Sequence, residues 1–413
     1  MKQSEIFSRA QKNFPKDEEA NNARLLIRAG FINKEMAGVY SLLPLGLRVI
    51  KNIEQIIREE MEAMGGREML MSVMHPKENW DKTGRWGSFD ALYRVKARDG
   101  KEFALGPTHE EIVVPLMKKF IESYKDLPVY VYQIQNKLRD EPRAKSGLLR
   151  GREFLMKDFY SFHSSEDDLD EFYKKMMEAY SRLFGKIGLS TMIVEASGGT
   201  FCKYSHEFQV LSDVGEDTIF YCDRIDSGKP CLFAQNKELA DKKGGSPCPK
   251  CDHPIKVASG IEVGNIFKLG TNFSLPFDLS YKDKSGKERN VFMGCYGIGI
   301  TRVMGAIVET LSDKDGLVWP ESVSPFKVHL LELEGASAEN IYQVLLKRGV
   351  EVLYDDRRIS AGEKFAEADM VGIPYRVVIS PKTGDKVELK ERAGKDVRLI
   401  DFNELVAILT KTR

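Results

Sequence analysis

The sequence predicts an α+β protein of two or three domains, and three observations support this fold class. Several separated segments carry apolar residues at helical spacing. The strand-like pieces before residue 300 favour antiparallel pairing, because one of them forms a hairpin pattern. From residue 327 onward short strands and helices alternate, and this order predicts a compact α/β module.

The first long helix is predicted to follow an extended segment that ends at Pro44. Apolar residues recur along it at helical spacing until Gly65-Gly66 stops it: Leu47, Ile50, Ile53, Ile57, Met61 and Met64. Residues 93–106 then predict a hairpin that turns at Asp99-Gly100.

Further helices are predicted from residue 107 and over 164–188, where Ser164 or Ser165 caps an acidic first turn. Two strand-like pieces follow, at 261–270 and 290–299. The next helix has one apolar face, made of Ile300, Val303, Met304, Ile307, Val308 and Leu311. Residues 318–326 hold two prolines and predict a linker between domains.

Composition excludes several classes of protein. The net charge is zero, so a nucleic-acid partner would have to be held by local patches. No apolar run is long enough to cross a bilayer, and the first residues lack the apolar core of a signal peptide. Six cysteines in 413 residues are too few for a disulfide scaffold, so a cytoplasmic protein is expected.

The segment "KLRDEPRAKSGLLRGREFLMKDFYSFH", residues 137–163, crowds cations and carboxylates into one loop before a strand. A solvated surface hairpin is one explanation of such a charge run. The mixed signs and the small residues at the tip favour a second one. Guanidinium groups would hold a phosphate-bearing ligand, while carboxylates accept hydrogen bonds from a base or an amine.

Two other segments suggest binding chemistry. "GCYGIG", residues 294–299, has the wrong spacing and strand context for a dinucleotide fold, and favours backbone packed against a flat ligand near Arg302. In "GPTHEE", residues 106–111, Thr108 and Glu111 have the spacing of a capping box. Glu110 is not needed for that cap, so it is the better candidate for binding an ammonium group.

The cysteine-containing segment 222–257 has no periodicity. "CPKC", residues 248–251, is a good half-site for tetrahedral zinc, because a C-x₂-C hook suits that geometry. The other half is irregular, since Cys222 and Cys231 are nine residues apart. Zinc bound by Cys222, Cys231, Cys248 and Cys251, or four unligated reduced thiols, remain the two alternatives.

Taken together, the segments resemble the class II aminoacyl-tRNA synthetases over essentially the whole chain. "LLPLGLRVIKNIEQIIREEMEAMGGREMLMSVMHP", the loop after Lys137 and "GCYGIGITR" are similar to motifs 1, 2 and 3 of that class. "GPTHEE", "SHEFQVLSDVGED", "GIEVGNIFKLGT" and "YDDR…GIPYRVVI" resemble the bacterial prolyl-tRNA synthetase family. The resemblance is specific because the separated motifs follow the family's order.

The resemblance implies ATP-dependent activation of L-proline, with Mg²⁺, followed by transfer to tRNA(Pro). Arg139 and Arg302 are the implied catalytic residues. The implied ATP-binding residues are Arg139, Glu141, Phe154, Glu262, Asn265 and Arg302. The implied proline-binding residues are Thr108, Glu110, Arg139 and Phe267. Arg143 and Lys145 are implied to meet the tRNA acceptor end. No nucleophilic side chain is needed, and His109, His163 and His206 are expected to be structural.

The resemblance also implies a domain plan. The catalytic domain would occupy 1–221 and 258–322, and an anticodon-binding domain 327–413. Its candidate readers of anticodon guanines are Asp355, Asp356, Arg357 and Lys364, although a charged loop explains each of them equally well. The segment 222–257 would replace the large editing domain of many bacterial members, so a separate trans-editing deacylase is an expected partner.

The motif 1 helix is expected at a homodimer interface, although the apolar face of that helix fits a monomer core equally well. A synthetase for threonine or histidine shares motifs 1 to 3. A non-catalytic paralogue is the alternative from another class, and it would be expected to lose Arg139, Glu141 or Arg302, which are all present.

Overall fold

The computed structural model describes residues 1–144, 146–226 and 228–410. The chain forms two compact units. The large unit contains residues 37–39 and 54–306, and the small unit contains residues 1–36, 40–53 and 307–413. The helices α2 (Pro44–Ala63) and α7 (Ile300–Leu311) each contribute residues to both units.

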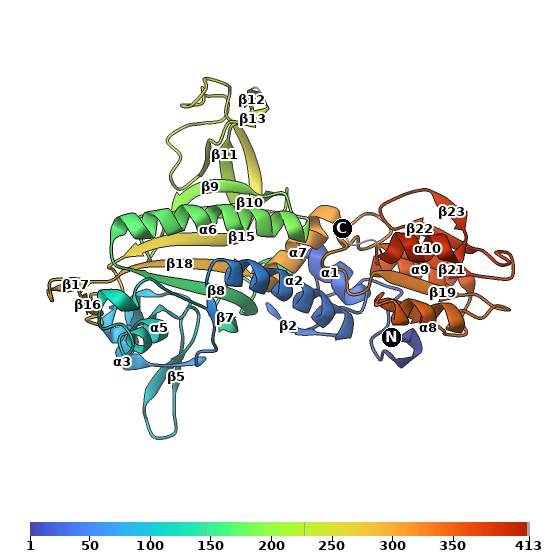
Figure 1. The fold of residues 1–413 in the computed structure, drawn as a ribbon, viewed down its shortest axis with the longest axis horizontal. Helices are drawn as coiled ribbons and strands as arrows, with labels where there is room; N and C mark the ends of the chain where they lie inside the picture. Colours follow the sequence, from blue (N-terminus) through green and yellow to red (C-terminus); the bar gives the residue numbers. More distant parts are fainter. Residues whose placement is uncertain (145, 227, 411–413) are drawn as a thin grey trace. The chain divides into compact units, whose positions relative to one another are not determined.

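The large unit is built on a nine-stranded sheet of order β10-β9-β14-β11-β15-β18-β8-β7-β3 (Figure 1). Its strands are β3 (Arg67–Glu68), β7 (Val129–Leu138), β8 (Glu153–His163), β9 (Met192–Ser197), β10 (Tyr204–Leu211), β11 (Asp217–Tyr221), β14 (Ala234–Asn236), β15 (Lys256–Gly270) and β18 (Phe292–Gly299). The central run β15-β18-β8-β7 is antiparallel. The predicted antiparallel sheet is therefore confirmed.

The helix α6 (Glu166–Ile187) packs along this sheet, over β15 and β18 (Figure 1). Its start and end follow from the sequence. The Ser165 side chain accepts a hydrogen bond from the Asp168 backbone N–H, and Gly188 ends the helix with a φ of 91°. Phe172 packs its ring against Tyr130, with centroids 4.2 Å apart. The predicted helix is thus confirmed, with Ser165 as the cap.

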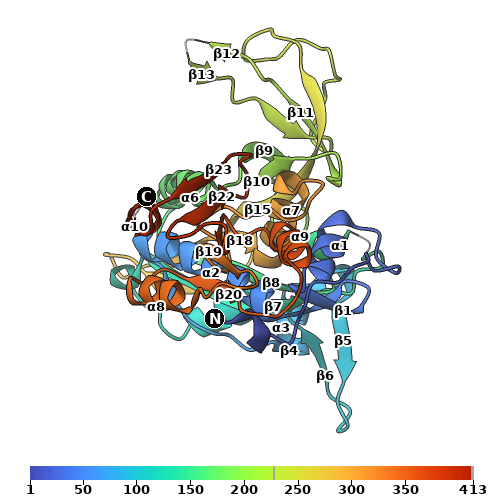
Figure 2. The same cartoon turned by 90° about the vertical axis from the view of Figure 1, so that its right-hand side faces the viewer.

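Shorter elements surround the sheet of the large unit. A three-stranded sheet of order β4-β6-β5 contains the hairpin predicted at Asp99-Gly100, where Gly100 has a φ of 85°. The shorter elements of the large unit are α3 (Lys77–Lys82), α4 (Arg85–Ser88), α5 (Glu110–Met117), β4 (Met74–Pro76), β5 (Tyr93–Lys96), β6 (Glu102–Leu105), β12 (Ile225–Asp226), β13 (Lys229–Pro230), β16 (Ser280–Lys282), β17 (Glu288–Asn290), η2 (Tyr124–Asp126) and η3 (Gly147–Leu149). The strand β11 and the separate two-stranded sheet of β12 and β13 project away from the other strands of the large unit (Figure 2).

The small unit contains a five-stranded sheet of order β20-β19-β21-β22-β23, in which β20, β19 and β21 are parallel. Its elements are η1 (Gln3–Glu5), α1 (Asn21–Arg28), β1 (Ile32–Met36), β19 (Val328–Glu332), α8 (Glu339–Lys347), β20 (Val352–Asp355), α9 (Ala361–Val371), β21 (Tyr375–Ile379), β22 (Val387–Glu391), β23 (Val397–Ile400) and α10 (Phe402–Thr410), and β2 (Val39–Leu42) follows β1. The predicted alternation is confirmed, whereas α10 was not predicted.

The apolar stripe predicted on α2 is buried at its centre. Ile50, Ile53, Ile57 and Met61 are fully buried, while Leu47 is 40% exposed. The predicted linker, residues 318–326, has no helix or strand, and its Trp319, Val323 and Phe326 are buried. In the described part of the chain, no helix is long and apolar enough to cross a membrane.

Candidate active site

The charged loop lies between β7 and β8, which are antiparallel neighbours. Leu138 and Glu153 form the last pair of that ladder, so both ends of the loop meet at one point. Just beyond, the Arg139 N–H donates to the Arg152 carbonyl at 2.8 Å. The Arg139 guanidinium lies 5.1 Å from the Phe154 ring, and its Nε donates to the Pro107 carbonyl at 3.3 Å. Burial, and next the nearby Arg302, lower the pKa of Arg139.

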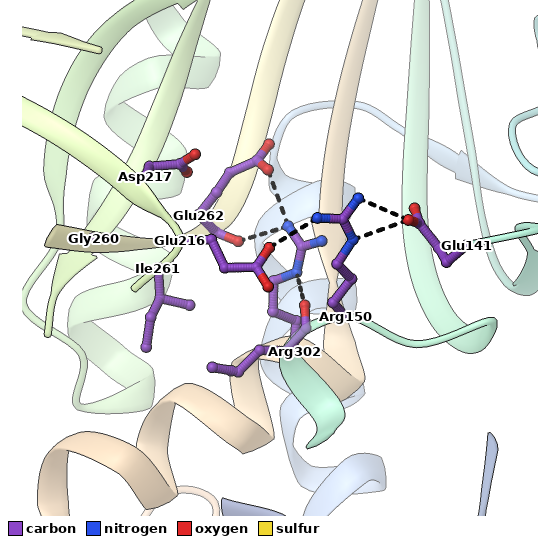
Figure 3. Close-up of a pocket in the computed structure, with 9 residues that line it drawn as sticks. Glu141, Arg150, Glu216, Asp217, Gly260, Ile261, Glu262 and Arg302 are labelled. Atoms are coloured by element: carbon purple, nitrogen blue, oxygen red, sulfur yellow. Dashed lines mark hydrogen bonds and ion pairs between the residues drawn. The ribbon is translucent and has the colours of Figure 1, made fainter. Parts of the chain in front are cut away.

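A polar cavity of about 240 Å³ opens beside this loop (Figure 3). Arg150 crosses it, with its Nη2 2.8 Å from Glu141 and its Nη1 3.2 Å from Glu216. The Arg302 Nη1 lies 3.0 Å from Glu262, and its Nε donates to the Leu149 carbonyl at 2.7 Å. Two guanidinium groups and four carboxylates therefore line one cavity, because Asp217 also belongs to its wall. Arg150 and Glu216 had no predicted role, although Arg150 lies in the segment that the sequence singled out.

A further carboxylate, Glu207, is linked through Gln209 to Asp217, which lines this cavity. The Gln209 amide donates to Glu207 at 2.9 Å and to Asp217 at 2.7 Å, and so holds these two side chains together. Burial, and next the charge of Glu262, raise the pKa of Glu207 to about 8. Asn265 reaches Glu207 at 3.5 Å, and its Oδ1 has no hydrogen-bond partner among the described residues.

The segment around Thr108 is organised differently from the prediction. The N-cap of α5 is His109, and no side chain caps the helix, so the predicted capping box of Thr108 with Glu111 is wrong. Thr108 instead donates its hydroxyl proton to the Glu110 carboxylate. Glu111 turns to Arg85, 2.8 Å away. Glu111 therefore forms an ion pair with a residue distant in sequence instead of a local cap, and Arg85 was not predicted.

A buried polar network lies beneath this segment. Lys137 pairs with Asp158 at 2.5 Å, and Gln133 and Tyr160 also donate to Asp158, at 2.9 and 3.0 Å. The Tyr160 hydroxyl oxygen in turn accepts the His109 backbone N–H at 3.2 Å. The network therefore fixes the start of α5 to the sheet.

The three histidines expected to be structural have hydrogen-bonded rings, and His109 and His163 are fully buried while His206 is half-buried. Burial lowers the pKa of His109 to about 4, and its Nε2 lies 3.1 Å from the Ser72 carbonyl. His163 lies 2.8 Å from Asp168, and His206 lies 2.9 Å from the Tyr173 hydroxyl.

The remaining predicted residues of the large unit are more scattered. Phe267, on β15, packs against Phe201 with ring centroids 5.1 Å apart. Arg143 is exposed, whereas Lys145 lies outside the described residues.

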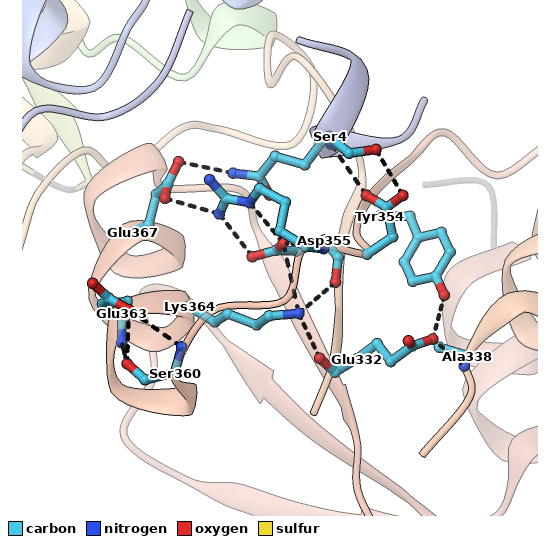
Figure 4. A network of polar contacts seen from close by, with 12 residues as sticks. Ser4, Glu332, Ala338, Tyr354, Asp355, Ser360, Glu363, Lys364 and Glu367 are labelled. Carbon is cyan, nitrogen blue, oxygen red and sulfur yellow. Dashed lines mark hydrogen bonds and ion pairs between the residues drawn. The ribbon is translucent and has the colours of Figure 1, made fainter. Parts of the chain in front are cut away.

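The four candidates in the small unit lie around one connected network (Figure 4). Asp355 is fully buried and accepts two hydrogen bonds from Arg357, both at 2.8 Å. Lys364 is 2% exposed, and its Nζ donates to the carbonyls of Glu332 and Asp355. Asp356 accepts from the Ser4 hydroxyl at 2.7 Å. A cavity of about 680 Å³ borders this network, lined among others by Asp356, Arg357, Arg358 and Lys364.

The four predicted cysteines form one cluster, with all sulfur atoms within 4.8 Å of one another. Cys222 and Cys251 are 3.4 Å apart, and Cys231 lies 3.7 Å from Cys248. The small hairpin of β12 and β13 brings Cys222 and Cys231 together despite their irregular spacing. Tetrahedral thiolates at about 2.3 Å from zinc would be about 3.8 Å apart, close to these distances.

Two family models match the chain. The tRNA synthetase class II core domain (G, H, P, S and T) matches residues 93–311, and the anticodon binding domain matches residues 323–412. In fold, the chain resembles a crystal structure of prolyl-tRNA synthetase from Cryptosporidium parvum complexed with halofuginone and AMPPNP. That likeness has a TM-score of 0.77 at 18% identity, and covers 94% of this chain and 75% of the other.

Curated relatives are similar over their full length. The proline–tRNA ligase of Thermosipho melanesiensis is 36% identical, over 99% of this chain and 98% of the relative. That of Bacillus cytotoxicus is 35% identical over the whole of both chains. These alignments run over 556 and 566 residues, whereas this chain has 413, so well over a hundred aligned positions have no counterpart here. The chain belongs to the proline–tRNA ligase family of class II aminoacyl-tRNA synthetases.

Proposed function

We propose that this protein is a proline–tRNA ligase, which condenses L-proline with ATP to prolyl-adenylate and pyrophosphate and then transfers proline to the 3′ end of tRNA(Pro). The position of Arg139 carries the proposal. Its guanidinium lies against Phe154, at the cavity that Arg302 also lines, and its Nε contacts Pro107, next to Thr108. One cation thus lies between the candidate nucleotide site and the candidate amino-acid site.

The reaction needs positioning and charge stabilisation rather than a nucleophilic side chain. Attack of the proline carboxylate on the α-phosphate builds negative charge, and Arg139 would stabilise it. Phe154 and Arg302 would hold the adenine ring between them, and Glu141 would accept from its amino group. Because Arg150 now pairs with Glu141, adenine binding requires Arg150 to turn toward Glu216 or a phosphate.

Carboxylates at the cavity and beside it would contribute ligands to Mg²⁺ bound together with ATP. Glu207, Asp217 and Glu262 offer the oxygen ligands that this ion prefers, and Asn265 has an unused amide oxygen beside them. Burial, and next the charge of Glu262, disfavour the ionised form of Glu207, and a bound dication would stabilise that form. Bound Mg²⁺ would supply positive charge to the phosphates.

The imino group of proline would bind at Thr108 and Glu110. Glu110 is fully buried, and its Oε1 has no hydrogen-bond partner among the described residues. An ionised carboxylate in such a place favours a cationic ligand. Phe267 and Phe201 would provide an apolar wall for the ring.

The tRNA would contact both units. Arg143 and Lys145 remain the proposed contacts to the acceptor end, and the cavity in the small unit the proposed place for anticodon guanines. Within it, Asp355 and Lys364 would hold the loop, because both are buried, while Asp356 and Arg357 would be the readers.

Cys222, Cys231, Cys248 and Cys251 would bind a structural zinc ion. Besides the sulfurs, the local core of this segment contains only two buried apolar side chains among the described residues, Phe233 and Ile255. A hydrophobic core this small does not keep a separate segment folded without a metal ion or disulfide bonds.

Three proposals rest on the resemblance. The protein would be a cytoplasmic homodimer with α2 near the interface. The segment 222–257 is too short for an editing domain. The protein would therefore activate alanine measurably and rely on a separate trans-editing deacylase, since a missing methylene changes binding by only about 1–3 kcal/mol.

The decisive experiment is ATP–pyrophosphate exchange with each of the twenty amino acids. Exchange with proline well above threonine and histidine supports the proposal. Exchange with none of them would favour the non-catalytic paralogue. Incubation of preformed alanyl-tRNA(Pro) with the protein tests the editing proposal, because deacylation well above the buffer rate would contradict it.

A further inference from the structure

Arg85 is a buried cation that the proposed reaction does not yet use. It opens α4 and is only 5% exposed. Its guanidinium carbon lies 4.6 to 5.4 Å from the centroids of four rings, those of Trp80, Phe89, Phe201 and Phe273. Its Nε and Nη2 have no hydrogen-bond partner in the described residues, so the rings hold the group in place. Such burial of a charge is costly unless a nearby carboxylate balances it.

Two buried carboxylates share this one cation unequally. The Arg85 Nη1 lies 2.8 Å from Glu111 but 3.9 Å from Glu110. Thr83 also donates to Glu111, at 3.0 Å. Glu110 and Glu111 are both fully buried in the first turn of α5. Arg85 therefore compensates Glu111 first.

The remaining charge lies on Glu110. When both carboxylates are ionised, the three side chains carry one net negative charge. Glu110 accepts from Thr108 through Oε2, and its Oε1 has no partner among the described residues. A secondary ammonium group has two N–H donors. The free Oε1 of Glu110 and the hydroxyl oxygen of Thr108 are two acceptors that match them.

We propose that Arg85 is a positioning residue for the cationic nitrogen of the substrate, because it neutralises Glu111 and leaves Glu110 as the single uncompensated carboxylate of the pocket. This inference rests on the proposed function and names a residue that sets substrate affinity without touching the substrate. Substrate affinity then depends on the number of buried charges. Arg85 is one cation, Glu110 and Glu111 are two carboxylates, and the substrate nitrogen supplies the second cation.

Other charged or titratable groups interact with Glu110 from neighbouring elements: Lys137 at the end of β7, Arg139 just after it, Tyr160 on β8 and Cys295 on β18. Lys137 is already paired with Asp158. None of these groups changes in the experiment below, so their influence cancels. Burial raises the pKa of Glu111 to about 7, against the opposing charge of Arg85. The charge count with both carboxylates ionised therefore applies above about pH 7, and without Arg85 the two carboxylates would keep a shared proton to higher pH.

Three variants distinguish this role from a purely structural one. In Arg85→Met, a proton shared by the two carboxylates neutralises Glu110 part of the time. The KM for proline should rise about tenfold or more, and the pH profile of kcat/KM for proline should shift to higher pH, because loss of a neighbouring cation raises a carboxyl pKa. In Glu111→Gln, Arg85 turns to Glu110 and compensates it, so the KM for proline should also rise.

The double variant Arg85→Met with Glu111→Gln restores the original charge count. Its KM for proline should lie closer to that of the unchanged protein than either single variant does. The KM for ATP should stay within about twofold in all three, and circular dichroism should confirm their folding. Arg85→Lys keeps the cation and should change the KM for proline by less than about threefold.

Two results overturn the inference. One is a double variant as impaired as the worse single variant, or more so. The other is a KM for proline in Arg85→Lys that rises about tenfold or more over that of the unchanged protein, and this result remains available if Arg85→Met fails to fold. Absence of proline-dependent exchange in the unchanged protein would instead refute the proposed function, so the two failures are distinguishable.

Discussion

Lys137 offers the sharpest test of how the buried network stabilises the large unit. Its ammonium group is fully buried and lies 2.5 Å from Asp158, which is 2% exposed. Substituting Lys137 by Met keeps the stem of the side chain but removes the charge. Asp158 then keeps only the two neutral donors Gln133 and Tyr160. Breaking one side of a buried pair costs about 3–5 kcal/mol, so the free energy of unfolding should fall by that amount.

A surface pair serves as the matched control. Lys118 lies 3.7 Å from Asp278, and these side chains are 47% and 90% exposed. The same substitution, Lys118→Met, should therefore cost about 0–1 kcal/mol. Adding Asp158→Asn to Lys137→Met should recover most of the loss, because no charge is then left buried alone. Urea unfolding followed by circular dichroism measures all three variants. Equal costs at Lys137 and Lys118 would refute the reasoning.

Three further predictions concern catalysis, pH and metal. Arg139→Ala should reduce proline-dependent exchange by at least a hundredfold, by analogy with loss of one transition-state donor at about 3 kcal/mol, and near-normal exchange would contradict its role. Burial lowers the pKa of Lys157 to about 7, below its value in the unfolded chain, so the free energy of unfolding should rise between about pH 7 and pH 10. The variant Lys157→Met should flatten this rise. The same slope in the variant and in the unchanged protein would contradict this prediction. Protein purified without chelator should contain about one equivalent of zinc, and Cys248→Ser should lower this zinc content strongly. Less than a tenth of an equivalent in the unchanged protein would exclude a zinc site.

Local signals in the sequence were sufficient for much of the fold. Ser165 and Gly188 set the ends of α6 through their own backbone and side-chain chemistry, so their positions were readable. The turn at Asp99-Gly100 likewise depends on one glycine with positive φ. The α/β alternation after residue 327 followed from periodicity, whereas α10 has no start signal as clear as a capping box.

The candidate site was predictable only where a motif carries it. Arg139, Glu141 and Arg302 belong to recognisable segments, and the structure brings Glu141 and Arg302 to one cavity with Arg139 beside it. The partnership of Arg85 with Glu111 has no local signal, because the two residues belong to different helices. The predicted capping box was wrong for the same reason, since Glu111 pairs with a residue that is distant in sequence. The convergence of the four cysteines likewise depends on a hairpin that the irregular spacing concealed.

The pairing of Tyr221 with Lys256 makes the cysteine-containing segment, residues 222–257, a place where the chain can accept a different insertion. These two residues face each other across the β11–β15 ladder, so the segment leaves and re-enters the sheet at neighbouring positions. Any insertion whose ends meet at that spacing can replace it, and each doubling of its length adds only about 0.6 kcal/mol of loop-closure cost. Glu262 and Asn265 lie on the part of β15 that pairs with β10 and β18, outside the inserted segment, so the register of these ladders sets their positions. The length of this inserted segment can therefore change among relatives, or in engineered hybrids, without changing the orientation of the side chains at the nucleotide cavity.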